Sequence, residues 1–314
     1  MPVGLNAAGI VGIARETTIG TYVAPQKYIP IRSETLEANN ELIERRVIRN
    51  LAGVVGIVPG NLHYAGDIEI EALDDIVPYF LNASRTVGTK TGTSGNFTYA
   101  FSPAHGALPA RSLSITVVRN GVVFGYTGCI VGSMEFTLDN GMLISRMGII
   151  GAAEATQSLP TPTWPTTAPY GPGQYTIQIP TGTTVCDVDM SYSFTIEDNA
   201  TPEFRLCGTR EAEFARFGER SCSLTLARDF VDKTDFNDFK ATPPVSQNIN
   251  LRAQTSVSRG ITINTATTIK TSYSVGLAAQ GDLTRAEIEY NVVGDPEYSI
   301  LVHTGEDIST PSFP

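Results

Sequence analysis

Charged residues are scarce in this sequence. Asp, Glu, Lys and Arg make up 17% of its 314 residues, whereas about a quarter is usual for a soluble domain. Acidic residues outnumber basic ones by 32 to 22, which gives a net charge of −10. Tight nucleic-acid binding depends on lysine and arginine, so the excess of acidic residues argues against a protein that binds nucleic acid tightly. An acidic wall repels phosphate, however, and would let nucleic acid slide past.

Histidine and cysteine are also rare, and neither has the spacing of a metal site. The three histidines are His63, His105 and His303, and they form no HxH or HExxH motif. The four cysteines are Cys129, Cys186, Cys207 and Cys222. They form no CxxC pair, so we expect reduced and mostly buried thiols. The motifs GxSxG, GxGxxG and GxxxxGK[S/T] are absent as well. We therefore predict no catalytic residue, no metal ion and no cofactor, and a protein that is not an enzyme.

Long hydrophobic runs are missing too. No segment reaches the roughly 18 apolar residues of a membrane-spanning helix. The first residues, MPVGLNAAGIVGIARETT, lack a basic region, so we expect no secretory signal.

One acidic pattern is the best lead for chemistry. Four aspartates recur at every third position from Asp229 to Asp238. A calcium loop needs carboxylates two positions apart, a central glycine and a terminal glutamate, and this segment has none of these. We interpret the pattern as the solvated face of a helix, with Phe236 and Phe239 buried on the opposite side.

The residues that are present favour strands and turns. Thr, Ser, Gly and Val are frequent, and His63–Leu73 alternates between apolar and polar side chains, as a half-buried strand does. The dipeptide Asn120-Gly121 predicts a tight hairpin turn, because both residues accept a positive φ. Residues 74–82 predict a short helix, with Asp74 or Asp75 as its N-cap.

The same order of elements occurs twice. Residues 27–152 predict two strands, a loop, a strand, a helix and three more strands, and residues 186–303 repeat this order. Such self-similarity indicates an internal duplication. Residues 153–185 are rich in Pro, Thr and Gly and contain the only tryptophan, Trp164, which is typical of a linker. We expect residues 1–26 to form an N-terminal arm and residues 304–314 a C-terminal tail.

One predicted loop is unusually apolar. Leu51–Leu62 contains Gly and Pro, which favour a loop, but the run LAGVVGIV over residues 51–58 is too hydrophobic to remain in solvent. We therefore expect neighbouring copies of the chain to cover it and to order the N-terminal arm. The candidate residues for assembly are Leu51, Val54, Val55, Ile57 and Val58.

Several motifs together resemble the major tail tube proteins of long-tailed phages (siphophages). They are GIARETTIGTYVAPQKYIPIRSE over residues 12–34, GDIEIEAL over 66–73, SLSITV over 112–117, GCIVGS over 128–133 and SFTIEDN over 193–199. The resemblance implies a mainly β fold, a tail-tube-like sandwich or half-barrel with one flanking helix, present here as two tandem domains. It also implies a structural virion protein of the tail that is assembled in the host cytoplasm.

The resemblance implies a set of partners as well. Copies of the chain would form rings that stack into a tube and conduct DNA during ejection. A doubled chain implies three copies per ring with pseudo-sixfold symmetry, and six copies per ring is the alternative. Other tail proteins would bind the tube ends, and the tape measure protein and then DNA would pass through a neutral or negative lumen, with Glu69 and Glu71 as candidate wall residues. The competing functions are a carbohydrate- or cell-surface-binding β-protein of the tail tip, and a hydrolase with an unusual site.

Overall fold

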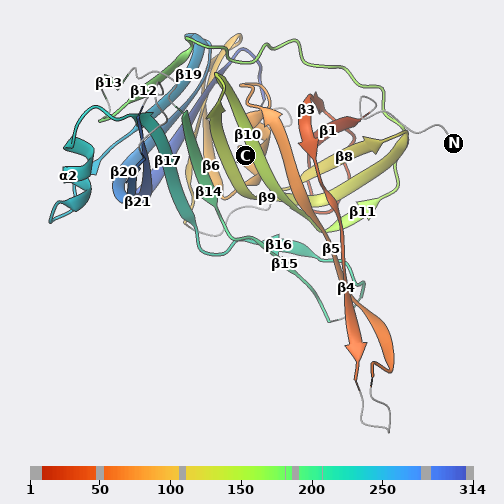
Figure 1. The fold of residues 1–314 in the computed structure, drawn as a ribbon. Coiled ribbons are helices and arrows are strands. Elements are labelled where there is room, and N and C mark those ends of the chain that lie inside the picture. Colours follow the sequence, from red (N-terminus) through yellow and green to blue (C-terminus); the bar gives the residue numbers. More distant parts are fainter. Residues whose placement is uncertain are drawn as a thin grey trace.

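The computed structural model describes residues 9–46, 53–105, 111–180, 182–185, 191–206, 208–276 and 284–308. This part of the chain is mainly antiparallel β-structure with two short helices, which confirms the predicted fold class (Figure 1). The first half comprises β1 (Ile10–Arg15), β2 (Lys27–Ile29), β3 (Ile31–Glu34), β4 (Glu37–Arg45), β5 (Gly56–Glu71), α1 (Val77–Ala83), β6 (Thr86–Thr93), β7 (Asn96–Pro103), β8 (Leu113–Arg119), β9 (Val122–Asp139), β10 (Met142–Gly151) and β11 (Ala153–Ala155).

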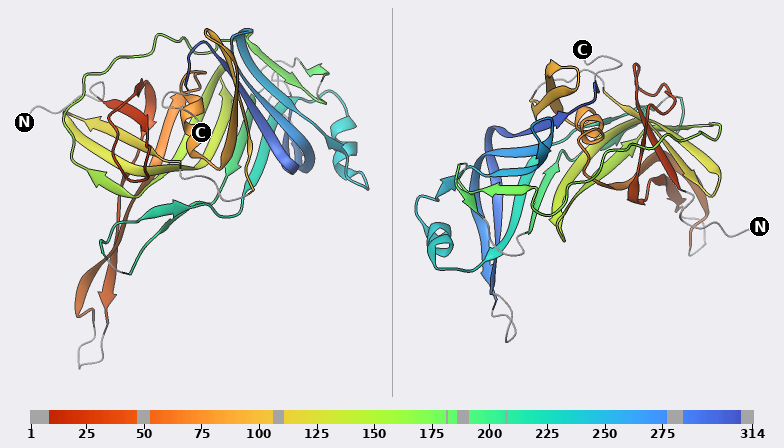
Figure 2. Two further views of the ribbon diagram at one scale, coloured as in Figure 1. Left: turned by 180° about the vertical axis from the view of Figure 1, so that it is seen from behind. Right: turned by 90° about the horizontal axis from the view of Figure 1, so that it is seen from above.

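The second half follows after a long connection. It comprises β12 (Tyr175–Gln178), β13 (Thr184–Val185), β14 (Ser191–Glu197), β15 (Thr201–Glu203), β16 (Phe214–Arg216), β17 (Ser221–Asp229), α2 (Thr234–Lys240), β18 (Ser246–Gln247), β19 (Asn250–Ser256), β20 (Arg259–Val275) and β21 (Arg285–Thr304). The two halves lie side by side, and α2 stands at the outer edge of the second half (Figure 2).

Each half pairs its strands in the same order. In the first half the antiparallel pairs are β1–β2, β1–β8, β8–β9, β9–β10, β10–β5 and β5–β3. In the second half they are β12–β13, β12–β19, β19–β20, β20–β21, β21–β17 and β17–β14. The helix follows β5 in one half and β17 in the other. This shared pairing order includes β1 and β12, which sequence analysis assigned to an arm and a linker.

One sheet runs without a break through both halves. Strand β14 pairs with β9, with Phe194 opposite Phe136, so the order β3–β5–β10–β9–β14–β17–β21–β20 is continuous. Strand β7 also pairs with the end of β21, with Phe101 opposite Ile300. One face of this sheet is apolar and contributes to a core cluster shared by both halves. The alternation that the sequence predicted for β5 is confirmed, because Ile68 and Ile70 are buried.

The predicted hairpin turn and both predicted helices are confirmed. Asn120 and Gly121 have φ values of 50° and 79°, as a tight turn between β8 and β9 requires. The N-cap prediction for α1 was wrong, because the cap is Ile76 and no side chain caps the helix. Asp74 and Asp75 are nevertheless buried, and each forms an ion pair with a basic side chain, as described below.

Three further predictions need correction. Ile10–Arg15 is not an arm but a strand paired on both sides, with β2 and β8. Most of the predicted loop Leu51–Leu62 belongs to β5, which begins at Gly56; Pro59 is tolerated because this stretch lies in a two-stranded ribbon. Phe236 and Phe239 were expected to be buried, yet each is 37% exposed, because α2 packs loosely beside β20.

Candidate assembly surfaces

The most prominent surface feature is a hairpin formed by β4 and the first part of β5. It extends well beyond the rest of the molecule (Figure 1). Glu44 pairs with Ile57, and Ile43 pairs with Val58. A two-stranded ribbon buries neither of its faces by itself, so the side chains at its end remain accessible.

The end of this hairpin is apolar. Leu42 and Ile57 are each 60% exposed, and Ile43 is 56% exposed. Ile43 and Val58 lie on one face of the ribbon and Ile57 on the other, because paired residues point to the same side. We call Leu42, Ile43, Val54, Ile57 and Val58 the hairpin patch. Apolar groups gathered at the end of a projection mark an interaction site more clearly than scattered ones do.

The structure brings together four of the five residues that sequence analysis selected. Val54, Ile57 and Val58 are exposed and Val55 is half-exposed, with the Val55 amide donating to the Arg45 carbonyl oxygen at 2.9 Å. Leu51 lies outside the described residues. Sequence analysis missed Leu42 and Ile43, because they were placed in a separate strand whose pairing with β5 was not anticipated.

A segment of the second half supports the base of the hairpin. The Leu62 amide donates to the Arg210 carbonyl oxygen at 2.8 Å, and the Ala212 amide donates to the Leu62 carbonyl oxygen at 3.0 Å. The Arg210 guanidinium also donates to the Gly60 carbonyl oxygen at 2.7 Å. Because these bonds attach the ribbon to both halves, its direction is fixed relative to the body of the molecule.

A second surface is the face of the continuous sheet that points away from the core. We call it the polar face. Its acidic side chains come from several strands and include Asp67, Glu69, Glu71, Glu135, Asp139, Glu197, Asp229, Glu287 and Glu289. Two arginines partly neutralise them: Arg146 lies 2.6 Å from Asp67, and Arg32 lies 3.3 Å from Glu69. Serine and threonine occupy most of the remaining positions, so carboxylates dominate the charge of this face.

A buried ion pair of the second half contacts the first half close to α1. Asp198 and Arg220 are 2.6 Å apart, with 2% and 5% of their side chains exposed. The Arg85 guanidinium of the first half donates to the Gly218 carbonyl oxygen at 2.8 Å. Burial raises the pKa of Asp198, and the charge of Arg220 opposes that shift. Both members of the pair belong to the second half, and both also bind Arg85 of the first half: the Arg220 guanidinium donates to the Arg85 carbonyl oxygen, and the Arg85 amide donates to Asp198 at 3.4 Å.

The start of α1 is held in the same way. Asp74 lies 2.7 Å from Arg259 of the second half, and Asp75 lies 2.7 Å from Lys27. Tyr170, from the connection between the halves, donates to Asp74 at 3.3 Å. All seven residues of α1 are buried, so this helix lies inside the junction rather than on the surface.

A buried carboxylate organises the segment that follows β1. Glu16 accepts hydrogen bonds from the Ser112 and Ser114 hydroxyls at 2.5 and 2.8 Å. It also accepts from the Gly20 and Gly128 amides at 2.8 and 2.9 Å. Four donors satisfy the charge without a cationic partner, which gives Glu16 a structural role.

Titratable groups outside these networks do not converge on a reactive site. Among the described residues, no group of histidine, cysteine, aspartate or glutamate could hold a metal ion. Burial raises the pKa of the Cys129 thiol well above its usual value and that of Cys222 to about 12, so both are inert; Cys186 and Cys207 lie outside the described residues. Burial lowers the pKa of His303, whose ring contacts Thr98 at 3.0 Å. Neither α1 nor α2 is long and apolar enough to span a membrane.

Comparison with known protein families gives a match over most of the chain. The family model described as phage tail tube protein matches residues 6–292, which is nearly the whole chain. None of the curated proteins compared with the chain matches it.

Proposed function

Since the chain belongs to the phage tail tube protein family, it is a structural component of the phage tail, and we propose that its copies form rings that stack into a tube for DNA ejection. The observation that carries this proposal is the hairpin patch. It is an apolar surface on a projection whose base is hydrogen-bonded to the second half, as a contact between successive rings requires. The polar face gives the second requirement, a wall to which DNA does not bind.

The hairpin patch is the proposed contact between rings. Removing a half-exposed Leu, Ile or Val side chain from water contributes about 1 kcal/mol, from roughly 25 cal/mol per Å² of apolar surface. Leu42, Ile43, Ile57 and Val58 together would contribute about 4 kcal/mol for each hairpin. Val54 and Val55 belong to the same proposed contact, and so does Leu51, which was selected from the sequence. Each ring would present several hairpins at once, so the contacts add along the tube.

The proposed ring contains three copies with pseudo-sixfold symmetry. The supporting observation is that both halves pair their strands in the same order and share one sheet through β9 and β14. If each half takes the place of one tube-like domain, three chains supply six such domains. A ring of six chains would require the second half to lie outside the tube wall, although its sheet continues that of the first half.

The polar face is the proposed lining of the lumen. Its carboxylates repel phosphate over about 8–10 Å at physiological salt, and the serine and threonine hydroxyls carry no positive charge. The tape measure protein and then DNA would pass along this wall without sequence-specific binding. The tube ends would bind other tail proteins.

A carbohydrate- or cell-surface-binding function is not favoured. Such sites present clustered exposed aromatic rings, whereas Trp164 is the only tryptophan. Its ring centroid lies 6.5 Å from that of Tyr28, in an edge-on contact that covers part of it.

The test is to compare assembly of the intact protein with that of a variant lacking Val54–Val58. These residues lie at the end of the hairpin, far from the core, so the variant should remain folded and soluble by circular dichroism. We expect ultracentrifugation to pellet tubes of the intact protein and to leave the variant in the supernatant as small species. Tubes of normal length from the variant would refute the hairpin contact.

A further inference from the structure

The junction between the two halves shows how one half docks on the next. At this junction β14 of the second half adds to the free edge of β9 in the first half. Ser193 of β14 lies opposite Thr137 of β9, and their hydroxyl oxygens are 3.5 Å apart. Helix α1 lies beside this junction, against β9 and β6, and all seven of its residues are buried.

The outer end of the second half has the same elements, but no other described segment of the chain docks on it. Helix α2 follows β17 as α1 follows β5, yet none of its residues is buried. Phe236 and Phe239 are each 37% exposed, and Val231, just before the helix, is 77% exposed. Lys270 of β20 holds the helix through Asp235, at 2.6 Å. A helix fixed in place with its apolar side chains uncovered indicates a missing neighbour.

Two strand edges are also unpaired within the described residues. Residues 271–275 at the end of β20 pair only with β21, and β3 pairs only with β5. Open edges readily accept a further strand. One edge ends the second half and the other begins the first half, so a second copy of the chain could close both.

The pairing register of the internal junction carries over to these edges. In the first half, one row of directly paired residues crosses the sheet from Glu71 of β5 through Ile144 of β10 to Thr137 of β9. The next residue in this row is Ser193 of β14, which pairs with Thr137. The corresponding row in the second half consists of Ala227, Glu287 and Ser274, across β17, β21 and β20.

The strand that would follow in this row is β3. Ser193 pairs with Thr225 of β17, and Ser33 pairs with Glu69 of β5. Thr225 lies between the buried Leu224 and Leu226, as Glu69 lies between Ile68 and Ile70, so Ser33 of β3 corresponds to Ser193. Ser33 and Ser274 are both exposed.

We propose that the end of β20 pairs antiparallel with β3 of a second copy of this chain, with Ser274 opposite Ser33, and that this copy covers α2. We call this contact the lateral seam. The proposal depends on the proposed ring assembly and specifies which residues join neighbouring chains within a ring. The seam repeats the junction of β9 and β14, so successive domains around the ring are related in nearly the same way whether or not they belong to one chain.

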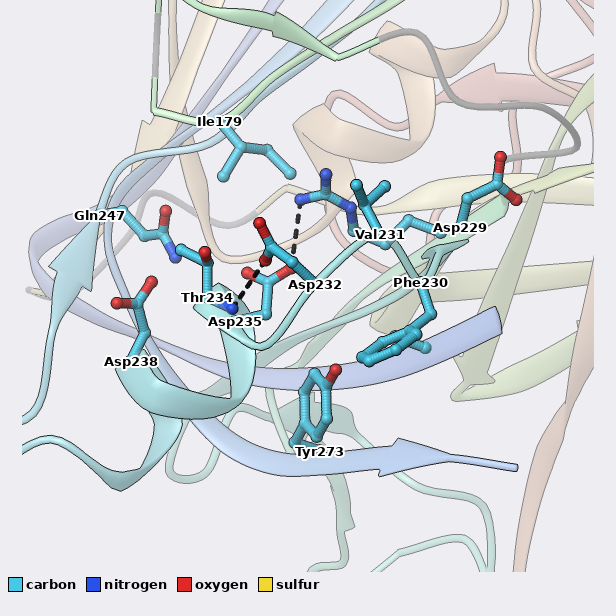
Figure 3. A pocket seen from close by; sticks show the side chains of 12 residues that line it. Ile179, Asp229, Phe230, Val231, Asp232, Thr234, Asp235, Asp238, Gln247 and Tyr273 are labelled. Atoms are coloured by element: carbon cyan, nitrogen blue, oxygen red, sulfur yellow. Dashed lines mark hydrogen bonds and ion pairs between the residues drawn. The ribbon is translucent and has the colours of Figure 1, made fainter. Parts of the chain in front are cut away.

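A cleft beside α2 fits this arrangement. It has a volume of about 360 Å³ and is lined by residues that include Ile179, Phe230, Val231, Asp235 and Tyr273 (Figure 3). Beside α1 the corresponding space is filled by the chain that leads into β12, where Thr167 and Tyr170 contact Asp75 and Asp74. In the seam, the second copy would cover this cleft together with α2.

Cysteine cross-linking tests the register directly. Directly opposed residues of antiparallel strands have Cα atoms about 4.5–5.5 Å apart, within the range that a disulfide spans. The test variant carries Ser33→Cys and Ser274→Cys. The positive control carries Thr137→Cys and Ser193→Cys, which should link within one chain. The negative control carries Ser33→Cys and Ser223→Cys, because β17 lies inside the sheet and cannot reach β3 of another copy.

We expect oxidised tubes of the test variant to give dimers and trimers on a non-reducing gel, while both controls remain monomeric in size. Tubes that form but give no intermolecular link, while the positive control closes its own disulfide, would overturn the seam and leave the tube function intact. Intact protein that stays monomeric under all assembly conditions would instead overturn the tube function, and the seam with it.

Hydrogen exchange of the intact protein covers the case in which the cysteine variants fail to fold. Amides of residues 31–34 and 271–275 should exchange more slowly in tubes than in monomers. Those of β14 serve as the reference, because β14 is paired in both states. Equal exchange of the two edge segments in tubes and monomers would overturn the seam.

Discussion

Ile57→Asp should abolish tube formation without unfolding the subunit. Ile57 is 60% exposed in the isolated chain and pairs with Glu44 near the end of the hairpin. Because it contributes nothing to the core, its replacement should change the free energy of unfolding by no more than about 0.5 kcal/mol. In a tube the same side chain would be covered by the next ring.

The cost at that contact has two parts. The part of the isoleucine side chain that is exposed in the free subunit would be buried in the tube, and its loss removes about 1 kcal/mol of that contact. Placing a carboxylate without a hydrogen-bonding partner in an apolar contact adds at least about 2 kcal/mol. The sum of about 3 kcal/mol per copy corresponds to roughly a hundredfold rise in the critical concentration for assembly, since 1.4 kcal/mol is a factor of ten.

Sedimentation of polymer at a series of protein concentrations measures the critical concentration. Ile57→Val is the matched control, because it keeps an apolar β-branched side chain and should shift the critical concentration less than tenfold. Thermal unfolding of the unassembled variants checks that both are folded. An Ile57→Asp protein that assembles at the concentration of the intact protein would show that the hairpin patch does not lie between rings.

Four other substitutions test the buried ion pair, the buried Glu16, the pH dependence of stability and the polar face. Asp198→Ala leaves Arg220 buried without its partner and should lower the free energy of unfolding by about 3–5 kcal/mol, measured by urea denaturation. Glu16→Gln removes a charge that four donors share and should cost about 2–3 kcal/mol, seen as a lower Tm. The pKa of His303 is lowered in the folded protein, so the unfolded chain binds a proton at this histidine more readily than the folded chain does. The contribution of neutral His303 to stability is therefore present above about pH 6.5 and is lost as the pH falls through the lowered pKa. His303→Gln should remove that part of the pH dependence of the unfolding free energy. Glu197→Lys should give tubes that bind DNA at low salt and release it as salt rises, whereas unchanged DNA binding would place the polar face outside the lumen.

Local sequence patterns predicted those parts of the fold that local physics determines. The alternation around Ile68 and the Asn120-Gly121 turn were predicted correctly, because a strand period and a positive φ are properties of a few neighbouring residues. The repeat of element order was visible for the same reason. The fold class followed from these signals together with the resemblance.

Long-range contacts determined what the sequence did not show. Asp74 and Asp75 have the right position for an N-cap, but Arg259 and Lys27 bind them from distant segments. The strand β1 was hidden by glycines in a short apolar run. Of the assembly surface, the apolar run at Val54–Val58 was visible in the sequence, whereas Leu42 became part of it only through the pairing of β4 with β5.

Electron microscopy of the purified protein shows directly whether copies of the chain build a tube. Negative-stain images at concentrations above the critical one should show tubes of uniform width with a central channel, and end-on views should show pseudo-sixfold rings containing three copies. A protein that remains as isolated particles with no channel, across a range of concentration and salt, would contradict the account.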